Sequence, residues 1–259
     1  MPNKIDNCFA RLRAEKRKGF IPYICAGDPN LARTVDLALA LEKAGADIVE
    51  LGLPFSDPLA DGIVNQLAAQ RALAAGATTR GVLDCVTEIR KQSQIPIVLY
   101  TYLNPIFQFG LKDFHRAAEA AGVDGLLILD LPPEEDVDLA GDTVIHIRLI
   151  APTTPAARIA AIAKSAKGFL YYVSREGVTG ARDEVAASLP EQIAQLRKLA
   201  ALPIAVGFGI SNAEQAREVA RYADGVVVGS AIVDLIAKHG NKAVDKVAAF
   251  VRELIKAIR

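Results

Sequence analysis

The chain has 259 residues, about half of them hydrophobic, and its thirty basic residues balance thirty acidic ones. Zero net charge gives no support for a nucleic-acid partner or an anionic membrane surface, so we expect a small-molecule site. No apolar stretch is long enough to span a membrane, no cleavable leader is evident, and the three cysteines lack paired spacing. These features predict a cytoplasmic protein with reduced thiols.

Short apolar segments alternate with amphipathic helical segments along the whole chain. The predicted strands are Gly19–Cys25, Ala46–Leu53, Ile95–Tyr102, Gly125–Asp130, Thr143–Leu149, Phe169–Val173, Ile204–Phe208 and Gly225–Val228. The helical segments between them include Leu31–Ala44, Thr79–Gln92, Leu111–Ala121, Thr154–Lys164, Leu189–Ala200 and Ala213–Tyr222, with Thr79 and Ser211 as expected N-caps. Eight such strands with helical crossovers predict an α/β fold, a single (β/α)8 TIM barrel over residues 1–259.

Two predicted helices lie outside the repeating pattern. The first, Lys4–Arg17, has an apolar stripe at helical spacing that predicts a plug at the bottom of the barrel. The stripe contains Ile5, Cys8, Phe9 and Leu12. The second, Lys242–Arg259, carries a similar stripe at the end of the chain.

The run from Glu50 to Gly62 places two acids where a barrel active site would lie. Glu50 is in an apolar strand segment, and Asp61 closes the loop that follows. Because active sites of this fold lie at the C-terminal ends of the strands, both carboxyl groups suit acid and base chemistry. The alternative for Glu50 is an ion pair at the rim. Asp57, between Ser56 and a proline, is as well explained by an Asx turn as by catalysis.

A phosphate site is predicted after the last two strands. Gly209 follows the seventh strand, and Gly229 and Ser230 follow the eighth and precede the helical pattern Ala231–Ile236. Glycines let backbone amides approach an anion, and a helix N-terminus adds N–H groups and a favourable dipole. The alternative is that these glycines serve only as turns and caps. Gly180 is a candidate third wall.

The remaining candidates are a loop and two tyrosines. Ser174–Pro190 is longer than a typical loop of this fold, so we predict a lid over a ligand, with an ordinary flexible loop as the alternative. Tyr102 and Tyr171 lie near strand ends, where packing would also explain them. The scattered histidines argue against a metal cluster, and no lysine ends a strand where a Schiff base would need one.

These segments together resemble the alpha subunits of tryptophan synthase over essentially the full chain. The shared motifs are Glu50-Leu-Gly-Leu-Pro-Phe-Ser-Asp-Pro-Leu-Ala-Asp-Gly62, Tyr102-Leu-Asn-Pro105, Asp130-Leu-Pro-Pro-Glu-Glu135, Ser174-Arg-Glu-Gly-Val-Thr-Gly180, Gly207-Phe-Gly-Ile-Ser211 and Gly229-Ser-Ala-Ile232. The resemblance implies reversible retro-aldol cleavage of indole-3-glycerol phosphate to indole and glyceraldehyde 3-phosphate, in tryptophan biosynthesis.

The resemblance also implies a role for each site residue. Glu50 would be the acid and base at indole C3 and the side-chain hydroxyl, and Asp61 would accept the indole N–H and stabilise the indolenine-like intermediate. Thr179 would hydrogen-bond Asp61 on lid closure. The other expected substrate-binding residues are the pocket tyrosines Tyr102 and Tyr171 and the phosphate-cradle residues Gly180, Gly209, Gly229 and Ser230.

A partner follows from the same resemblance. Family members bind a beta subunit that carries pyridoxal phosphate, so this chain is expected to hold no cofactor and to join an α2β2 complex through residues 54–68 and 104–109. Three positions depart from the family pattern: Ile63 replaces a common proline, Asn65 a common apolar residue and Tyr23 a frequent phenylalanine. These departures bear on the polarity of the indole pocket, the rigidity of the catalytic loop and beta-subunit affinity.

Two alternative functions remain open at the level of sequence. The chain could be a stand-alone indole-producing lyase, or a weakly catalytic partner that binds and activates the beta subunit. The same residues would be present in each case.

Overall fold

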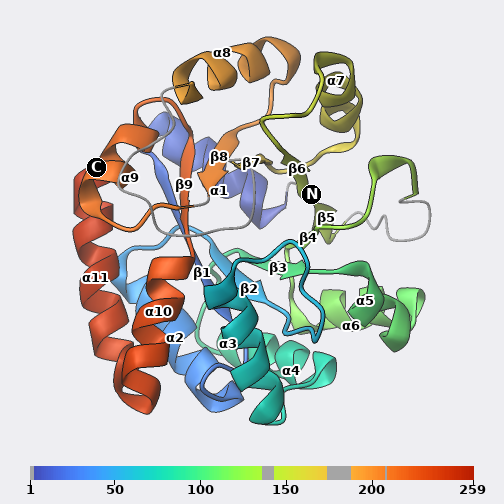
Figure 1. The fold of residues 1–259 in the computed structure, drawn as a ribbon, viewed down its shortest axis with the longest axis vertical. Helices are drawn as coiled ribbons and strands as arrows, with labels where there is room; N and C mark the ends of the chain where they lie inside the picture. The colour runs from blue at the N-terminus through green and yellow to red at the C-terminus, as the bar shows by residue number, and fades with distance from the viewer. Residues whose placement is uncertain (1–2, 136–142, 174–187, 208) are drawn as a thin grey trace.

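The fold is a barrel of parallel strands surrounded by helices (Figure 1). The computed structural model describes residues 3–135, 143–173, 188–207 and 209–259. Its strands are β1 Gly19–Cys25, β2 Val49–Gly52, β3 Ile97–Thr101, β4 Gly125–Ile128, β5 Ile145–His146, β6 Arg148–Ile150, β7 Leu170–Val173, β8 Ile204–Gly207 and β9 Gly225–Val228. They form one sheet in the order β5-β4-β3-β2-β1-β9-β8-β7-β6, with all pairs parallel. The predicted TIM barrel is confirmed.

The fifth predicted strand, Thr143–Leu149, is divided in the structure. β5 pairs with β4, whereas β6 pairs with β7, and Ile147 between them donates its backbone N–H to Leu126 at 2.9 Å. Nine strand segments therefore replace the eight predicted strands. The chain changes its hydrogen-bonded neighbour at this point, so β5 and β6 form the two edges of the sheet and bring the barrel almost to closure.

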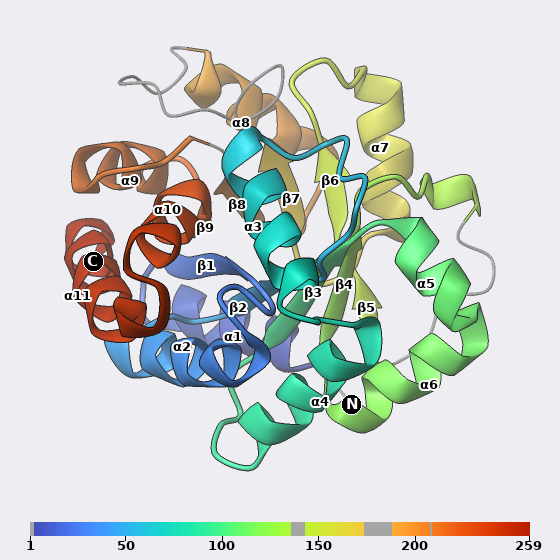
Figure 2. The same cartoon turned by 60° about the horizontal axis from the view of Figure 1, so that its bottom comes forward.

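Helices surround the sheet, and most of them cover its outer face (Figure 2). They are α1 Lys4–Ala14, α2 Leu31–Ala44, α3 Ile63–Ala74, α4 Thr79–Arg90, α5 Leu103–Phe109, α6 Leu111–Ala121, α7 Ala156–Ser165, α8 Leu189–Leu199, α9 Ala213–Ala220, α10 Ser230–His239 and α11 Ala243–Ile258, with short 3-10 turns at Pro133–Glu135 and Gly240–Lys242. The side-chain caps of α4 and α9 are Thr78 and Asn212, one residue away from the predicted Thr79 and Ser211.

Alternation along the strands divides the core into an inner and an outer layer. On β3, Val98 and Tyr100 belong to the inner cluster, whereas Ile97 and Leu99 belong to the outer cluster beneath the helices. The inner cluster also receives Ile21, Ile48, Leu127, Ile145, Phe169, Ala205 and Val227 from the other strands or their entry points. This alternation fixes which side chains point into the barrel and therefore which can reach a site at its mouth.

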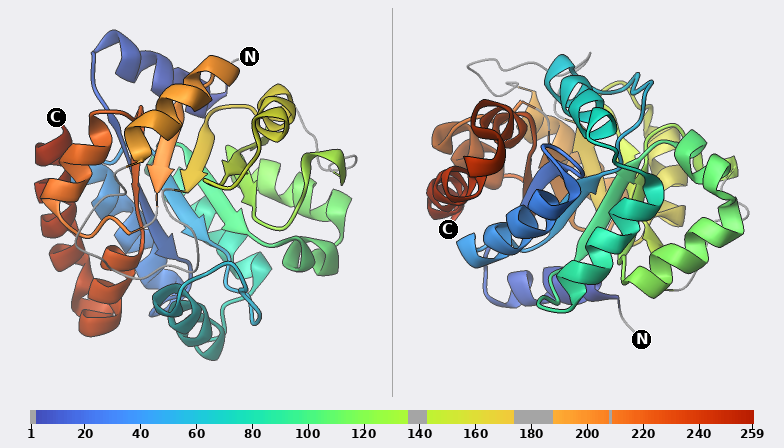
Figure 3. Two further views of the ribbon diagram at one scale, coloured as in Figure 1. Left: turned by 45° about the horizontal axis from the view of Figure 1, so that its top comes forward. Right: turned by 90° about the horizontal axis from the view of Figure 1, so that it is seen from below.

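The first helix closes the bottom of the barrel, as its sequence pattern predicts. Ile5, Cys8, Phe9 and Leu12 are buried in the same cluster as the inward side chains of the strands. Asn3 caps this helix by accepting from the Ile5 N–H and donates to the Asp124 carbonyl, which anchors α1 to the strand entrances. Figure 3 shows α1 and α3 at opposite ends of the strands. The C-terminal ends of the strands, opposite α1, are thus the end of the barrel that is open to a ligand.

Candidate active site

Glu50 and Asp61 lie together at the C-terminal mouth of the barrel. Glu50 is on β2 with its register partners Tyr23 on β1 and Val98 on β3, and its inward position leaves it 1% exposed. Asp61 precedes α3 in the loop after β2 and is 5% exposed. One strand and the loop that follows it therefore supply two buried carboxyl groups, as the sequence predicts.

The Asp61 carboxylate is held by three side-chain donors. Tyr100 donates its hydroxyl to Oδ1 at 3.0 Å, Tyr102 donates to Oδ2 at 2.8 Å, and the Asn65 amide donates to Oδ1 at 3.4 Å. Burial raises the pKa of Asp61, and the hydrogen bonds from Tyr102, Tyr100 and Asn65 act in the opposite direction because they stabilise the charged form. Asp61 is thus equipped to carry a negative charge in a buried place.

Glu50 has the opposite environment. Neither of its carboxyl oxygens has a hydrogen-bond partner among the described residues, and both are buried. Desolvation, followed by repulsion from Asp61, raises the pKa of Glu50 to about 8. A carboxylic acid with such a pKa is protonated over much of the neutral range and can both donate and recover a proton.

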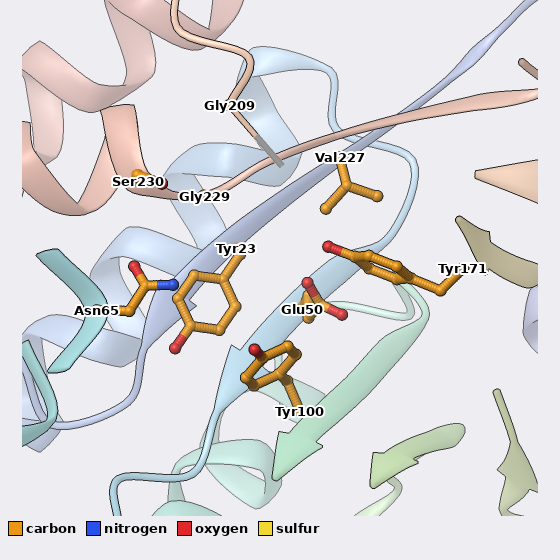
Figure 4. A pocket seen from close by; sticks show the side chains of 9 residues that line it. All are labelled: Tyr23, Glu50, Asn65, Tyr100, Tyr171, Gly209, Val227, Gly229 and Ser230. Carbon is orange, nitrogen blue, oxygen red and sulfur yellow. The ribbon is translucent and has the colours of Figure 1, made fainter. Parts of the chain in front are cut away.

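A small pocket opens over Glu50. In Figure 4, Glu50 lies between the rings of Tyr23, Tyr100 and Tyr171. The other lining residues are Asn65, Gly209, Val227, Gly229 and Ser230. Asp61 is connected to this pocket through Tyr100 and Asn65, which line it and donate to the Asp61 carboxylate. The pocket therefore combines flat aromatic walls with one carboxyl group at its base.

Three of the predicted phosphate residues, Gly209, Gly229 and Ser230, line the same pocket. Gly209 has φ of 84°, a conformation that favours glycine, and Gly229 is the N-cap of α10. No side chain in the described parts of the chain caps α10, so the N–H groups of Ser230 and Ala231 at its first turn keep no helical acceptor and are available to an anion. A second cavity, lined in part by Gly209, Ser230 and Ala231, extends the space on this side.

Both predicted tyrosines reach the site. Tyr102 donates to Asp61 and also accepts the Ala60 N–H at 2.9 Å. It therefore holds the loop between β2 and α3, residues 53–62, against the end of β3; this segment is the catalytic loop. Tyr171 lines the pocket from β7, and a Cβ on Gly207 would lie 2.5 Å from its hydroxyl oxygen. Glycine at 207 is therefore what admits this ring. For both residues the arrangement goes beyond ordinary packing.

Other predicted residues are placed elsewhere or lie beyond what is described. Thr179, Gly180 and most of the predicted lid, Ser174–Pro190, fall outside the described residues. Asp57 is exposed and accepts a hydrogen bond from Ser56, which supports its interpretation as a turn residue. Among the residues that the structure describes, no group of three or more His, Cys, Asp and Glu could hold a metal ion.

Sequence reasoning missed Tyr100. It lies on β3 two residues before Tyr102, which follows the end of this strand in an extended conformation, and this spacing turns both side chains to the same side. That spacing was visible in the sequence, whereas the contact with a loop residue 39 positions earlier was not.

Comparison with known proteins identifies the family. The family model described as tryptophan synthase alpha chain matches residues 9–259. The chain is 53% identical to the tryptophan synthase alpha chain of Opitutus terrae over 241 residues, covering 92% of this chain and 91% of that relative. The chain belongs to the tryptophan synthase alpha chain family.

Solved structures of this family have the same fold. A tryptophan synthase alpha chain from Legionella pneumophila superposes with a TM-score of 0.91 at 39% identity and covers 100% of this chain and 98% of that one. A structure that addresses the mutual activation of the tryptophan synthase α2β2 complex from Pyrococcus furiosus superposes with a TM-score of 0.86 at 38% identity. The match covers 93% of this chain and 99% of that one.

Membership of the tryptophan synthase alpha chain family establishes the class of reaction. The chain is a carbon–carbon lyase of tryptophan biosynthesis that acts on indole-3-glycerol phosphate. In this family pyridoxal phosphate belongs to the beta subunit, and the alpha chain carries no cofactor. None of the helices in the described parts of the chain is long and apolar enough to cross a bilayer.

Proposed function

We propose that Glu50 is the proton donor and acceptor of the cleavage and that Asp61 stabilises charge on the indole ring. One observation carries this assignment: the two buried carboxyl groups at the barrel mouth have opposite environments. Glu50 lacks a described partner, whereas Asp61 accepts hydrogen bonds on both oxygens. A pair of acids whose environments differ in this way divides into a proton carrier and a charge stabiliser.

The proton balance of the reaction fits this division. Protonated Glu50 gives its proton to indole C3, which places positive charge on the ring nitrogen. The Glu50 carboxylate then accepts the proton of the side-chain hydroxyl adjacent to the ring. The bond between C3 and the side chain breaks as the hydroxyl carbon becomes an aldehyde. Indole and glyceraldehyde 3-phosphate leave, and Glu50 is protonated again.

Asp61 would stabilise the intermediate through the ring N–H. A carboxylate has about four acceptor positions, and Tyr100, Tyr102 and Asn65 occupy three of them. One position therefore remains for the indole N–H. A buried, prepositioned negative charge near a developing cation is an effective way to lower a barrier, because little reorganisation is needed.

The substrate phosphate would bind to the amides at the start of α10. Gly209, Gly229 and Ser230 bring backbone close to the pocket without bulky side chains, and the helix dipole favours an anion there. Tyr171 and Tyr102 would orient the ring and the acids. By family resemblance Gly180 would add a further amide and Thr179 would contact Asp61.

We also propose an α2β2 complex with the beta subunit. Four large, exposed apolar side chains lie on the loop after β2, on α3 and on α5, where partner contact is expected: Leu59, Ile63, Leu67 and Phe107. Exposed apolar side chains of this size are enriched at protein interfaces. The partner would receive the indole product and stimulate the lyase. The biosynthetic family supports a cytoplasmic location.

The test is steady-state cleavage of indole-3-glycerol phosphate by the isolated chain and then with saturating beta subunit. We expect partner-stimulated cleavage that disappears in Glu50→Gln and falls strongly in Asp61→Asn. High activity that the partner leaves unchanged would favour a stand-alone lyase. Binding of the beta subunit without any cleavage would instead indicate an activating partner with lost catalysis and would overturn the proposed roles of both acids.

A further inference from the structure

Tyr100 reaches into the site from a rigid position. It lies on β3 in register with Gly52 of β2, two residues beyond Glu50, and its side chain is 5% exposed. The Tyr23 ring packs edge-on against it, with ring centroids 5.1 Å apart and an angle of 69° between the planes. Strand pairing and this ring contact together leave the Tyr100 hydroxyl little freedom to move.

Asp61 lies on a loop, yet a β3 residue, Tyr100, and the N-cap residue of α5, Tyr102, hold both of its oxygens. The Tyr100 hydroxyl contacts Oδ1 and the Tyr102 hydroxyl contacts Oδ2. A single donor leaves a carboxylate free to rotate about its terminal bond. Two donors on different oxygens fix its plane. Tyr102 keeps the extended backbone of β3 just beyond the end of this strand, and side chains two residues apart in extended chain point to the same side.

We propose that Tyr100 is a positioning residue that, with Tyr102, locks the Asp61 carboxylate in its reactive orientation before the substrate or the beta subunit binds. This inference rests on the role of Asp61 in the proposed function and deepens it. The clamp consists of one β3 residue and the residue that directly follows this strand, so the charge-stabilising group is already oriented by the barrel itself. Asn65, whose contact with Oδ1 is longer, supplements the clamp.

Removal of the Tyr100 hydroxyl has a consequence that loss of packing does not share. The hydrogen bond from Tyr100 is one of those that oppose the upward shift of the Asp61 pKa. Tyr100→Phe keeps the ring and its contact with Tyr23 but removes this donor. The pKa of Asp61 then rises, and the acidic limb of the pH–rate profile moves to higher pH.

The experiment compares Tyr100→Phe with the parent and with Tyr172→Phe as the matched control. Tyr172 is also a tyrosine of a barrel strand, but its side chain lies in the outer core layer. Its buried hydroxyl has no hydrogen-bond partner among the described residues. The full chain is assayed with saturating beta subunit. In parallel, the Asp61 carboxyl is titrated by carbon-13 NMR, assigned by the signal lost in Asp61→Asn, and amide spectra establish that each variant is folded.

For Tyr100→Phe we expect kcat to fall about tenfold, as suits loss of a hydrogen bond to a charged group, with KM within about twofold. We also expect the Asp61 titration and the acidic limb to move together to higher pH. Tyr172→Phe should match the parent in every readout. If Tyr100→Phe behaves like Tyr172→Phe, or loses activity without moving the Asp61 titration, the positioning role is wrong.

The proposed lyase function and the positioning role of Tyr100 can be disproved independently. If the parent chain with beta subunit does not cleave the substrate, the proposed function is wrong. The Asp61 titration requires no turnover, so it still decides whether Tyr100 controls this carboxylate.

Discussion

Asp47 and Glu50 are three residues apart in one segment of chain, both are buried, and they have opposite surroundings. At the bottom of the barrel, Asp47 accepts the Phe20 N–H at 3.0 Å and faces the guanidinium groups of Arg11, Arg17 and Arg259 at 3.3–3.7 Å. At the top, Glu50 has no partner in the described part of the chain. A carboxylate that is paired with cations helps to hold the fold together, whereas a buried carboxyl group without a partner keeps a proton that it can transfer.

The largest expected difference is in catalysis. Glu50→Gln should lower the rate of substrate cleavage by about 10³-fold, because the amide cannot transfer the proton. Asp47→Asn, the same chemical change at the other end of the barrel, should leave kcat within about twofold of the parent. Steady-state assays with beta subunit measure both. Substantial activity in Glu50→Gln would break the comparison.

Next in size is the pH dependence of stability. The pKa of Glu50 rises from 4.5 to about 8 on folding, so the folded state holds the proton more tightly than the unfolded state. Stability from this group is therefore fully present below about pH 4.5 and is lost as pH rises through 8. The parent should lose on the order of 4 kcal/mol relative to Glu50→Gln between these limits.

Urea unfolding of the two proteins from pH 5 to 9 measures this change. Because the chain has no tryptophan, far-UV circular dichroism is the suitable signal. A stability difference between parent and Glu50→Gln that stays constant with pH would show that Glu50 ionises normally.

Asp47→Asn should have the next largest effect, on stability alone. Loss of the charge leaves three arginines without their shared anion, although each arginine is partly exposed and water replaces some of the interaction. We expect the free energy of unfolding to fall by about 2 kcal/mol at pH 7. Unfolding in urea gives the value directly, and an unchanged midpoint would remove the structural role assigned to Asp47.

The smallest expected effect is on beta-subunit affinity, which we compare between variants at the two ends of the barrel. Phe107→Ala should weaken beta-subunit binding roughly tenfold, as loss of an exposed aromatic anchor at an interface does. Leu199→Ala is the matched control, because Leu199 is also exposed but ends α8 just before β8, at the bottom of the barrel. Calorimetric titration separates the variants. Equal affinities would place the beta-subunit contact elsewhere.

The sequence predicts most of the barrel because local patterns encode it. Alternation on the strands, the apolar stripe of α1 and the position of Glu50 in an apolar strand can all be recognised without tertiary contacts. The division of Thr143–Leu149 could not be predicted, since one continuous apolar run gives no sign that its two halves pair with different neighbours.

The candidate site shows the same limit. Glu50 and Asp61 were predictable, because strand ends and their loops carry the chemistry of this fold. The different surroundings of the two acids were not, because the donors to Asp61 come from β3, from Tyr102 just after it, and from α3. Tyr100 illustrates the difficulty: tyrosine in a buried strand is usually a packing residue, and only the fold brings its hydroxyl to a catalytic loop.

The ionisation of Glu50 itself tests most directly whether this residue is an acid that carries a proton at neutral pH. Carbon-13 NMR of glutamate carboxyl groups, compared between the parent and Glu50→Gln, isolates its signal. We expect a carboxyl that titrates near pH 8 in the folded chain and is missing from the variant. A Glu50 carboxyl that titrates near its ordinary value of 4.5 would contradict the assignment of an unpartnered, proton-bearing acid at the mouth of the barrel.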